Sequence, residues 1–260
     1  MVREGLTIIK LGGSVITFKD RPLTPNIEAI HNLSDVISKS GIDCVIVHGG
    51  GSFGHYYAKE YNITTRLDHY SAEGIAKTKL AMLKLHMYIL EALESHNLHP
   101  YSLPPMSFLH GGKVDERKRD LLQGLIEIDL TPVTFGDIIT INGKFQVISG
   151  DTLVRMLAES LKPARVIFTM DVDGIYRRLD DPSTLIRTID VSKDLELSSS
   201  KPLFDVTGGI ELKLSEAMKI ASLGIDVYFV NGLKADHVTK ALKGGSFIGT
   251  IIKGIGHGRY

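Results

Sequence analysis

The sequence has a single cysteine, Cys44, and no tryptophan among its 260 residues. One cysteine excludes an intrachain disulfide, and its place in the apolar run 44–47 indicates a buried thiol in a reducing compartment. No run of about 18 apolar residues occurs, and the apolar segment 6–9 near the amino terminus is too short for the core of a signal peptide. We therefore expect a soluble, cytoplasmic protein.

The sequence also lacks an excess of charge of either sign. Thirty Lys and Arg residues balance thirty Asp and Glu residues. This balance argues against a protein whose affinity comes from many nucleic-acid phosphates, although it is compatible with a local cationic pocket. The composition, 43% hydrophobic and 23% charged, is that of a globular chain and excludes a disordered or collagen-like one.

Apolar periodicity predicts alternating strands and helices along the chain. The first strand is expected at residues 6–9, and Thr24 and Pro25 are expected to cap a helix that ends at Gly41. Further strands are predicted near residues 44–47, 101–103, 132–135, 165–170, 225–230 and 247–253. Further helices are predicted over residues 73–96, 115–129, 151–161, 210–222 and 234–242.

This alternation predicts an α/β fold, a three-layer αβα sandwich whose mainly parallel central sheet is covered by helices on both faces. The length favours one domain. We expect a seam near residues 161–163, between an amino-terminal lobe (about 1–161) and a carboxy-terminal lobe (about 162–260) that share the sheet. Asn142-Gly143 predicts an exposed hairpin, because both central residues of a type I′ turn need positive φ.

Three glycine-rich turns are candidates for phosphate binding. They are residues 10–14 after the first strand, residues 48–55 after the second, and residues 205–209 before a helix that carries Lys213. In an open α/β sheet ligands lie beyond the carboxyl ends of the strands, where glycine lets backbone N–H groups approach a phosphate. Each turn alone is a weak signal.

Other nucleotide and metal motifs do not fit. Gly49, Gly51 and Gly54 match G-x-G-x-x-G, and Asp68 stands near the position of a ribose-binding acid. No sustained apolar strand precedes Asp68, so an NAD-dependent enzyme is not favoured. The sequence contains no P-loop motif, no C-x-x-C or H-E-x-x-H zinc pattern and no G-x-S-x-G nucleophile elbow.

Five segments are more specific in combination than any one of them alone. They are Lys10-Leu11-Gly12-Gly13-Ser14, His48-Gly49-Gly50-Gly51-Ser52, Ser149-Gly150-Asp151, Asp171-Val172-Asp173-Gly174-Ile175-Tyr176 and Asp205-Val206-Thr207-Gly208-Gly209. In order and spacing, the sequence resembles the amino acid kinase family over essentially its whole length. Within that family, residues 51–55 and Lys19 resemble the branch that phosphorylates isopentenyl phosphate.

The resemblance implies ATP-dependent phosphorylation of isopentenyl phosphate to isopentenyl diphosphate, an archaeal-type step of isoprenoid biosynthesis, by a homodimer. Mg²⁺ would bridge the ATP phosphates without a metal site on the protein. The implied catalytic residues are Lys10, Lys19, His55, Asp151 and Lys213. The implied nucleotide ligands are Lys10, Gly12, Gly13, Ser14, Gly50, Asp171, Asp173, Gly174, Gly208, Gly209 and Lys213. The implied acceptor ligands are Gly49, Gly50, Gly54, His55 and Gly150.

Physical chemistry is compatible with these roles. A phosphate monoester with a second pKa of about 6 is largely dianionic at neutral pH, so it needs no dedicated base to attack the γ-phosphorus. The difficulty is its repulsion from ATP, which cations and preorganised N–H groups must overcome. Lys10, Lys19 and Lys213 suit this task. Asp151 is expected to orient them and to cap the following helix, and His48 to orient its turn from within.

A hydrocarbon tail would need an apolar wall. Ile75, Thr78 and Met82 lie at positions i, i+3 and i+7, so one helix face presents all three towards the expected substrate lobe. Core packing is an equally good interpretation of this spacing. We expect these residues either to close the end of a substrate pocket or to pack in the core.

Two alternative functions stay open. Another kinase of the family, acting on a carboxylate, a carbamate, UMP or a phosphonate such as fosfomycin, would share the fold and the ATP motifs. A nucleotide-binding regulator or storage protein would share the fold without catalysis. His55 and the lack of an obvious carboxylate reader argue against the first alternative, and Lys10, Asp151 and Lys213 argue against the second.

Overall fold

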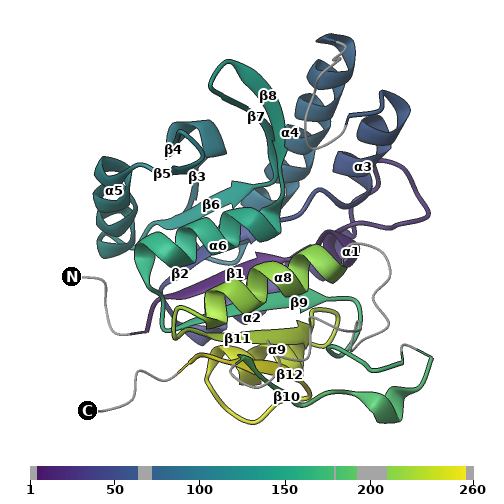
Figure 1. The fold of residues 1–260 in the computed structure, drawn as a ribbon, viewed down its shortest axis with the longest axis vertical. Helices are drawn as coiled ribbons and strands as arrows, with labels where there is room; N and C mark the ends of the chain where they lie inside the picture. The colour runs from purple at the N-terminus through teal and green to yellow at the C-terminus, as the bar shows by residue number, and fades with distance from the viewer. Residues whose placement is uncertain (1–4, 64–71, 179, 192–209, 256–260) are drawn as a thin grey trace.

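The computed structural model describes residues 5–63, 72–178, 180–191 and 210–255. Within them, strands of one large sheet form the middle layer of the molecule (Figure 1). The strands are β1 (Thr7–Leu11), β2 (Cys44–His48), β3 (Pro100–Ser102), β6 (Thr131–Phe135), β9 (Arg165–Met170), β10 (Thr188–Asp190), β11 (Asp226–Asn231) and β12 (Gly249–Lys253). Their order is β10-β12-β11-β9-β1-β2-β6-β3, and only the β11–β12 pair is antiparallel. The predicted α/β fold is confirmed.

Helices cover both faces of this sheet. They are α1 (Gly13–Ile16), α2 (Ile27–Ser40), α3 (Gly51–Glu60), α4 (Ala72–Ser95), α5 (Glu116–Glu127), α6 (Gly150–Leu161), α8 (Ile210–Ala221) and α9 (Ala235–Leu242). Helices α5, α6 and α8 pack in one hydrophobic cluster with the sheet, and α2, α4 and α9 pack in a second cluster on the opposite face. The helices α6 and α8 lie side by side in front of the strands in Figure 1.

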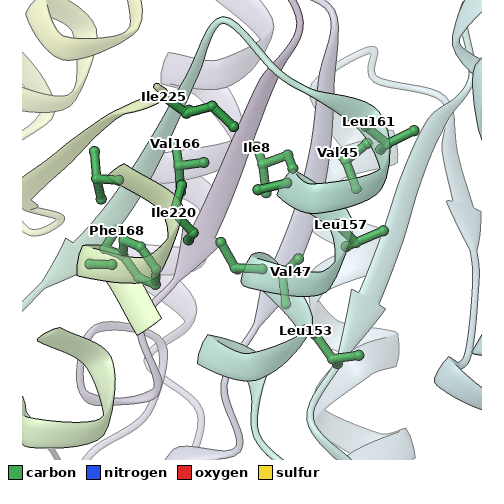
Figure 2. Packing of buried hydrophobic residues seen from close by; sticks show 14 of the residues in the cluster. Ile8, Val45, Val47, Leu153, Leu157, Leu161, Val166, Phe168, Ile220 and Ile225 are labelled. Carbon is green, nitrogen blue, oxygen red and sulfur yellow. The ribbon is translucent and has the colours of Figure 1, made fainter. Parts of the chain in front are cut away.

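The α6 side of the core shows why the apolar spacing predicts the fold. Leu153, Leu157 and Leu161 follow one another every four residues, so they share the helix face that lies on Val45 and Val47 of β2 (Figure 2). Each of these leucines is at most 4% exposed. Burial of a leucine side chain stabilises a fold by about 1.5–3 kcal/mol, so this row fixes α6 firmly against the strands.

The predicted hairpin is formed by β7 (Asp137–Ile141) and β8 (Lys144–Ile148). Asn142 and Gly143 both have positive φ, 51° and 76°, as the turn type requires. The expectation that the whole hairpin is exposed is wrong at its base, where Asp137 is buried and accepts a 2.6 Å hydrogen bond from Lys79 of α4. The hairpin stands beside α4 (Figure 1), and this contact holds the two elements together.

Helix starts are the main local corrections. Thr24 does not cap α2, because its carbonyl accepts from Phe18 N–H in an extended turn, and Asn26 is the cap, with a side chain that accepts from Ala29 N–H at 3.2 Å. Gly41 ends the helix with φ of 64°, as predicted. Asp151 does not cap α6, since Ser149 Oγ does so by accepting from Thr152 N–H at 3.0 Å.

The stretch after Gly51 is a helix where a glycine-rich turn is expected. Phe53, 2% exposed, anchors α3 in the core, and this burial overrides the low helix propensity of the glycines around it. Cys44 is buried as predicted, and burial raises the pKa of its thiol to about 12. In the described part of the chain, no helix combines the length and the hydrophobicity that crossing a membrane would require.

Candidate active site

The candidate site lies where the parallel strands β1, β2 and β9 end and where α6 begins. In the register, Lys10 of β1 pairs with Val47 of β2 and with Phe168 of β9. A Cβ built on Gly150, at the start of α6, would lie 3.1 Å from the carbonyl oxygen of His48 and 3.2 Å from Lys10 Cε. The absence of a side chain at Gly150 therefore lets the helix amino terminus approach both strand ends.

The centre of the site is one carboxylate shared by two lysines. Lys10 Nζ and Lys213 Nζ both donate to Asp151 Oδ1, the latter at 3.0 Å. Their side chains are only 5% and 15% exposed, and that of Asp151 is 11% exposed. The Phe168 ring lies beneath both ammonium groups, with its centroid 5.8 Å from Lys10 Nζ and 5.6 Å from Lys213 Nζ. The structure thus brings together three residues that are far apart in the sequence.

Burial makes this cluster electrostatically unbalanced. Among the described residues, the cluster holds two lysine amines and one carboxylate, so it carries one excess positive charge when both amines are protonated. Burial and then the nearby Lys213 lower the pKa of the Lys10 ammonium to about 7, although Asp151 acts in the opposite direction. Burial acts to raise the pKa of the Asp151 carboxyl, but the two lysines outweigh it and hold that pKa below its usual value. An anion placed here would meet a partly desolvated, uncompensated positive charge.

A second ion pair joins the same two helices one turn further along. Arg155 of α6 donates from Nε to Glu216 of α8, and its Nη1 reaches Glu159 at 2.5 Å. Glu216 is 4% exposed and also accepts from Lys219 at 2.9 Å. This pair is a second polar contact between α6 and α8, next to the one between Asp151 and Lys213.

Asp171 connects the ends of β1 and β9. Its carboxylate accepts from Ser14 Oγ at 2.8 Å and from Lys19 Nζ at 2.7 Å. Although burial acts to raise it, the pKa of Asp171 is lowered by Lys19 and Ser14. The side chain of Lys19 is 68% exposed, so the ammonium group can leave Asp171 for a bound phosphate at little cost.

Asp173 forms a further cluster with two residues that the sequence motifs do not single out. Its Oδ1 accepts from Asn231 Nδ2 at 2.9 Å and from Lys234 Nζ at 2.8 Å. Asn231 ends β11, and Lys234 precedes α9, so both are adjacent to Asp173 only in the folded chain. Gly174 is buried against Thr250, where a Cβ would lie 2.6 Å from Oγ1, so a side chain here would clash with this packing.

The loops after β1 and β2 lie in direct backbone contact. A Cβ on Gly13 would lie 2.4 Å from the backbone nitrogen of Gly51, and one on Gly12 would lie 2.2 Å from the carbonyl oxygen of Thr169. Gly51 also has φ of +47°, which an L side chain rarely adopts. Thr17 Oγ1 accepts from Ser52 N–H at 2.9 Å and ties α1 to the start of α3.

The predicted acceptor side is built on α3 and α4. Met82 Sδ lies under the start of α3, where it would be 3.0 Å from a Cβ on Gly50 and 3.2 Å from one on Gly54. His55 lies in α3 and is exposed, and its ring makes no hydrogen bond or ion pair with the described residues. Its contact with an acceptor phosphate therefore stays a prediction.

The helix face predicted as a pocket wall is mixed in character. Met82 is 2% exposed and Thr78 is 6% exposed, while Ile75 is half-buried. The Thr78 hydroxyl donates to Gly74 carbonyl within α4 at 2.8 Å, so it presents its methyl group rather than an unsatisfied polar atom. Met82 packs in the core beneath the glycine loop, and Ile75 is the one of the three with substantial free surface.

Gly208 and Gly209, with the rest of the segment 205–209, lie outside the described residues, as does Asp68. Among the residues that the structure describes, no group of three or more His, Cys, Asp or Glu side chains could hold a metal ion. Asp171 and Asp173, the two carboxylates that follow β9, each accept hydrogen bonds from neighbouring side chains.

The fold and this arrangement define a class of phosphotransferases. The profile of the amino acid kinase family matches residues 5–231, and the chain belongs to this family. More distant similarity extends to the acetylglutamate kinase of Gracilaria tenuistipitata var. liui, which is 26% identical over 75% of this chain and 73% of its own length.

Greater similarity is found to one group of relatives. Isopentenyl phosphate kinase of Methanothermobacter thermautotrophicus is 34% identical, over 96% of this chain and 99% of that protein. Isopentenyl phosphate kinase of Thermoplasma acidophilum is 32% identical, over 95% of this chain and all (100%) of that protein. The crystal structure of the T. acidophilum enzyme in its product complex superposes with a TM-score of 0.78, and a substrate complex of isopentenyl phosphate kinase, 31% identical, gives the same value of 0.78.

Proposed function

We propose that this protein transfers the γ-phosphoryl group of ATP to isopentenyl phosphate and releases isopentenyl diphosphate and ADP. The observation that carries the proposal is the buried Lys10–Asp151–Lys213 cluster at the edge where two glycine loops meet. The similarity to isopentenyl phosphate kinases over nearly the whole chain supports this acceptor over the other substrates of the family.

The chemistry requires charge compensation rather than a base. A phosphate oxygen of the acceptor forms the new bond to the γ-phosphorus, and the bond from that phosphorus to the β–γ bridging oxygen breaks, so the electron pair leaves with ADP. Lys10 and Lys213 stabilise the charge on the transferring group. Asp151 already accepts from both lysines and is ionised, and its role is to orient them rather than to remove a proton.

The remaining predicted ligands group around this centre. The Gly13 N–H and the Ser14 hydroxyl approach the ATP phosphates, and Lys19 moves from Asp171 onto them. Gly12, whose N–H donates to Thr169 Oγ1 at 3.0 Å, lets the loop come close to the nucleotide. Asp173 and Gly174 line the nucleotide side, where Asn231 and Lys234 are additional candidates. Mg²⁺ supplies further neutralisation of the ATP phosphates when it is bound. Gly208 and Gly209 remain predicted nucleotide ligands.

The acceptor is proposed to lie over the start of α3. Gly49, Gly50, Gly54 and Gly150 leave room for its phosphate to approach the backbone, although the N–H groups of Gly49 and Gly54 already donate to the carbonyls of Leu11 and Gly50. His55 contacts the phosphate from the exposed side of the helix. The hydrocarbon tail extends towards α4, where the half-buried Ile75 offers apolar surface, and Thr78 and Met82, which are buried in this structure, remain predicted residues of the pocket wall. Burial of a five-carbon tail contributes about 4 kcal/mol at about 0.8 kcal/mol per carbon, enough to favour the substrate over inorganic phosphate.

This assignment supports two lobes that divide the work. The acceptor residues on α3, α4 and the α6 amino terminus belong to the lobe of about residues 1–161, and Asp171, Asp173, Asn231 and Lys234 belong to the lobe of about residues 162–260. Lys10 and Lys213, one from each lobe, meet at Asp151. The transferring phosphoryl group would therefore lie at the seam.

We also infer a cytoplasmic homodimer, following the family resemblance. Helix α4 exposes Leu80, Leu83 and Met87, which are 55%, 46% and 51% exposed and share one helix face. A second copy of the chain would cover this face. Sedimentation velocity checks the inference: the parent should sediment as a dimer, Leu83→Glu should sediment as a monomer, and a parent monomer would contradict it.

A phosphoryl-acceptor screen with labelled ATP tests the proposed function. Isopentenyl phosphate should have the highest kcat/KM among isopentenyl phosphate, dimethylallyl phosphate, fosfomycin, UMP and acetylglutamate. A higher kcat/KM for fosfomycin, UMP or acetylglutamate would assign the protein to another kinase of the family. ATP binding without transfer to any acceptor would assign it to the non-catalytic regulators.

A further inference from the structure

A chain of hydrogen bonds between uncharged groups runs from the glycine loop after β2 into the core. His48 Nδ1 lies 3.1 Å from Gly49 carbonyl, His48 Nε2 lies 3.0 Å from His86 Nδ1, and His86 Nε2 lies 2.9 Å from Ser102 Oγ. The three side chains come from the end of β2, from α4 and from the edge strand β3. The family motifs include His48 but neither of its partners.

Both rings are enclosed in apolar surroundings. His48 is 0% exposed and His86 is 2% exposed, and the Phe135 ring packs against both, with centroids 5.3 Å and 4.5 Å away. Burial and the neighbouring His86 lower the pKa of His48 to about 3, and burial lowers that of His86 to about 4. Both imidazoles are therefore neutral at physiological pH, with one N–H each.

Neutrality leaves only one order of protons along this chain. Gly49 carbonyl can only accept, so His48 carries its proton on Nδ1 and accepts on Nε2. His86 must then donate from Nδ1, and its Nε2 accepts from the Ser102 hydroxyl. The hydrogen bonds all run in one direction, and each ring is fixed in its Nδ1–H tautomer.

This order has a consequence for the next peptide group. The Gly49–Gly50 peptide is trans, so the carbonyl of Gly49 and the N–H of Gly50 point in opposite directions. Because His48 holds the carbonyl, the N–H of Gly50 is directed away from the imidazole pair. Among the described residues no acceptor partners this N–H. A rotated peptide would instead present a carbonyl oxygen to a bound anion.

We propose that His48, His86 and Ser102 are positioning residues that hold the Gly49–Gly50 peptide with its N–H facing the acceptor phosphate. The identity of the phosphate rests on the proposed function, but the orientation of the peptide does not. His48 supplies the direct hydrogen bond. His86 fixes the tautomer of His48, and Ser102, which is exposed, makes the contribution that water can best replace.

Matched variants separate positioning from packing. His48→Leu removes the donor to Gly49 and should weaken binding of isopentenyl phosphate about ten-fold, the effect of one hydrogen bond to a charged group, with ATP affinity within two-fold of the parent. His48→Asn keeps an N–H donor near the Nδ1 position and should stay within three-fold of the parent. His86→Leu should resemble His48→Leu, whereas His86→Asn and Ser102→Ala should be mild.

Binding is measured by calorimetry with isopentenyl phosphate and by ³¹P NMR with inorganic phosphate, which lacks the hydrocarbon tail. Equal losses for both probes in His48→Leu, rescued in His48→Asn, are expected. Unchanged phosphate binding in folded His48→Leu and His86→Leu would overturn the positioning role. A parent protein that binds phosphate but does not phosphorylate isopentenyl phosphate would overturn the proposed function and leave the positioning role standing.

¹H–¹⁵N NMR of the parent protein independently tests which ring nitrogens of His48 and His86 carry the protons. Long-range ¹H–¹⁵N spectra at pH 7 should show two histidines in the Nδ1–H tautomer, and these two signals should disappear one at a time in His48→Asn and His86→Asn. An Nε2–H tautomer at His48, or a protonated ring at either position, would overturn the inference even if all variants lost activity.

Discussion

Two buried polar systems meet at the candidate site, and they are built in opposite ways. The Lys10–Asp151–Lys213 cluster has two lysines for one carboxylate, so it carries one unpaired positive charge once both lysines are protonated. The His48–His86–Ser102 chain is neutral, and each nitrogen of its two imidazole rings has a hydrogen-bond partner. Burial of an unpaired charge is costly, so it is expected only where a ligand of opposite charge arrives. A neutral, fully bonded chain holds geometry at a lower cost.

The largest expected effect is on the charged system. Lys10→Met or Lys213→Met should lower kcat for phosphoryl transfer by about 10²-fold or more, the scale of removing one electrostatic stabiliser of a transition state. Lys39→Met, at an exposed helix position, is the matched control and should leave kcat unchanged. Near-normal turnover by either folded site variant would remove that lysine from the mechanism.

The acceptor side should respond more selectively. His55→Ala should reduce kcat/KM for isopentenyl phosphate by about ten-fold, the effect of one charge-assisted hydrogen bond, while the KM for ATP stays near that of the parent. His55→Gln should recover part of the loss, because no proton transfer is required of this residue. Steady-state kinetics with each substrate varied check this. Parental kinetics for isopentenyl phosphate in His55→Ala would refute the contact.

The Arg155–Glu216 pair is a second charged contact between α6 and α8, and we assign no ligand to it. Its variants should therefore change stability rather than binding. Arg155→Met leaves the buried Glu216 carboxylate with Lys219 alone and should lower the free energy of unfolding by about 3 kcal/mol. The double variant Arg155→Met/Glu216→Met should recover most of this loss. Urea denaturation measures both. Full stability of the single variant would show that the register of α8 is fixed by apolar packing instead.

A smaller effect is expected where the site is apolar. Ile75→Ala should raise kcat/KM for geranyl phosphate relative to isopentenyl phosphate, by a shift of about 1–3 kcal/mol in preference, because an apolar wall controls chain length weakly. Ile75 suits this test better than Met82, whose removal would also undercut Gly50 and Gly54. Leu121→Ala, at an exposed position of α5, is the control. An unchanged ratio between the two substrates would place Ile75 outside the pocket.

The smallest expected effect is a change in the number of protons that the protein binds when phosphate binds. Because the pKa of Lys10 is lowered to about 7, this group is largely neutral at pH 8 in the free protein. A bound phosphate raises that pKa, so binding at pH 8 should take up between zero and one proton, and uptake should fall as the pH drops below 7. Calorimetry in buffers of different ionisation enthalpy measures the uptake. Proton release, or uptake that persists in Lys10→Met, would contradict this origin.

The layers of the fold can be predicted from the sequence because buried apolar residues recur at the spacing of a helix or a strand. The leucines of α6 and the apolar runs of β9 and β11 carry that signal, and their elements are confirmed to within a residue or two. Helix α3 is missed because its glycines argue for a turn, and only the tertiary contact of Phe53 and the close approach of Met82 explain the helix. Local propensity does not contain these contacts.

Some residues of the candidate site can likewise be predicted from sequence motifs, and others cannot. Lys10, Asp151, Asp171 and Lys213 belong to motifs that a family resemblance can recognise, and the structure brings the first, second and fourth of them together. His86, Ser102, Asn231 and Lys234 belong to no such motif, since each takes its place through strand order and helix packing. Contacts between residues far apart in the chain, such as Lys10 and Asp151, which are 141 residues apart, are a property of the topology, which periodicity does not specify.

The contact between Gly13 and Gly51 sets a mechanical limit on the reaction. The two backbones lie so close there that a side chain on Gly13 would collide with Gly51, so the loop proposed to bind ATP packs directly against the loop proposed to bind the acceptor. The distance between bound ATP and the acceptor phosphate would then depend on how closely these two backbone segments pack. A side chain at either glycine would force the two loops apart, and we expect it to lengthen the distance between bound ATP and the acceptor without touching the surface proposed for the hydrocarbon tail.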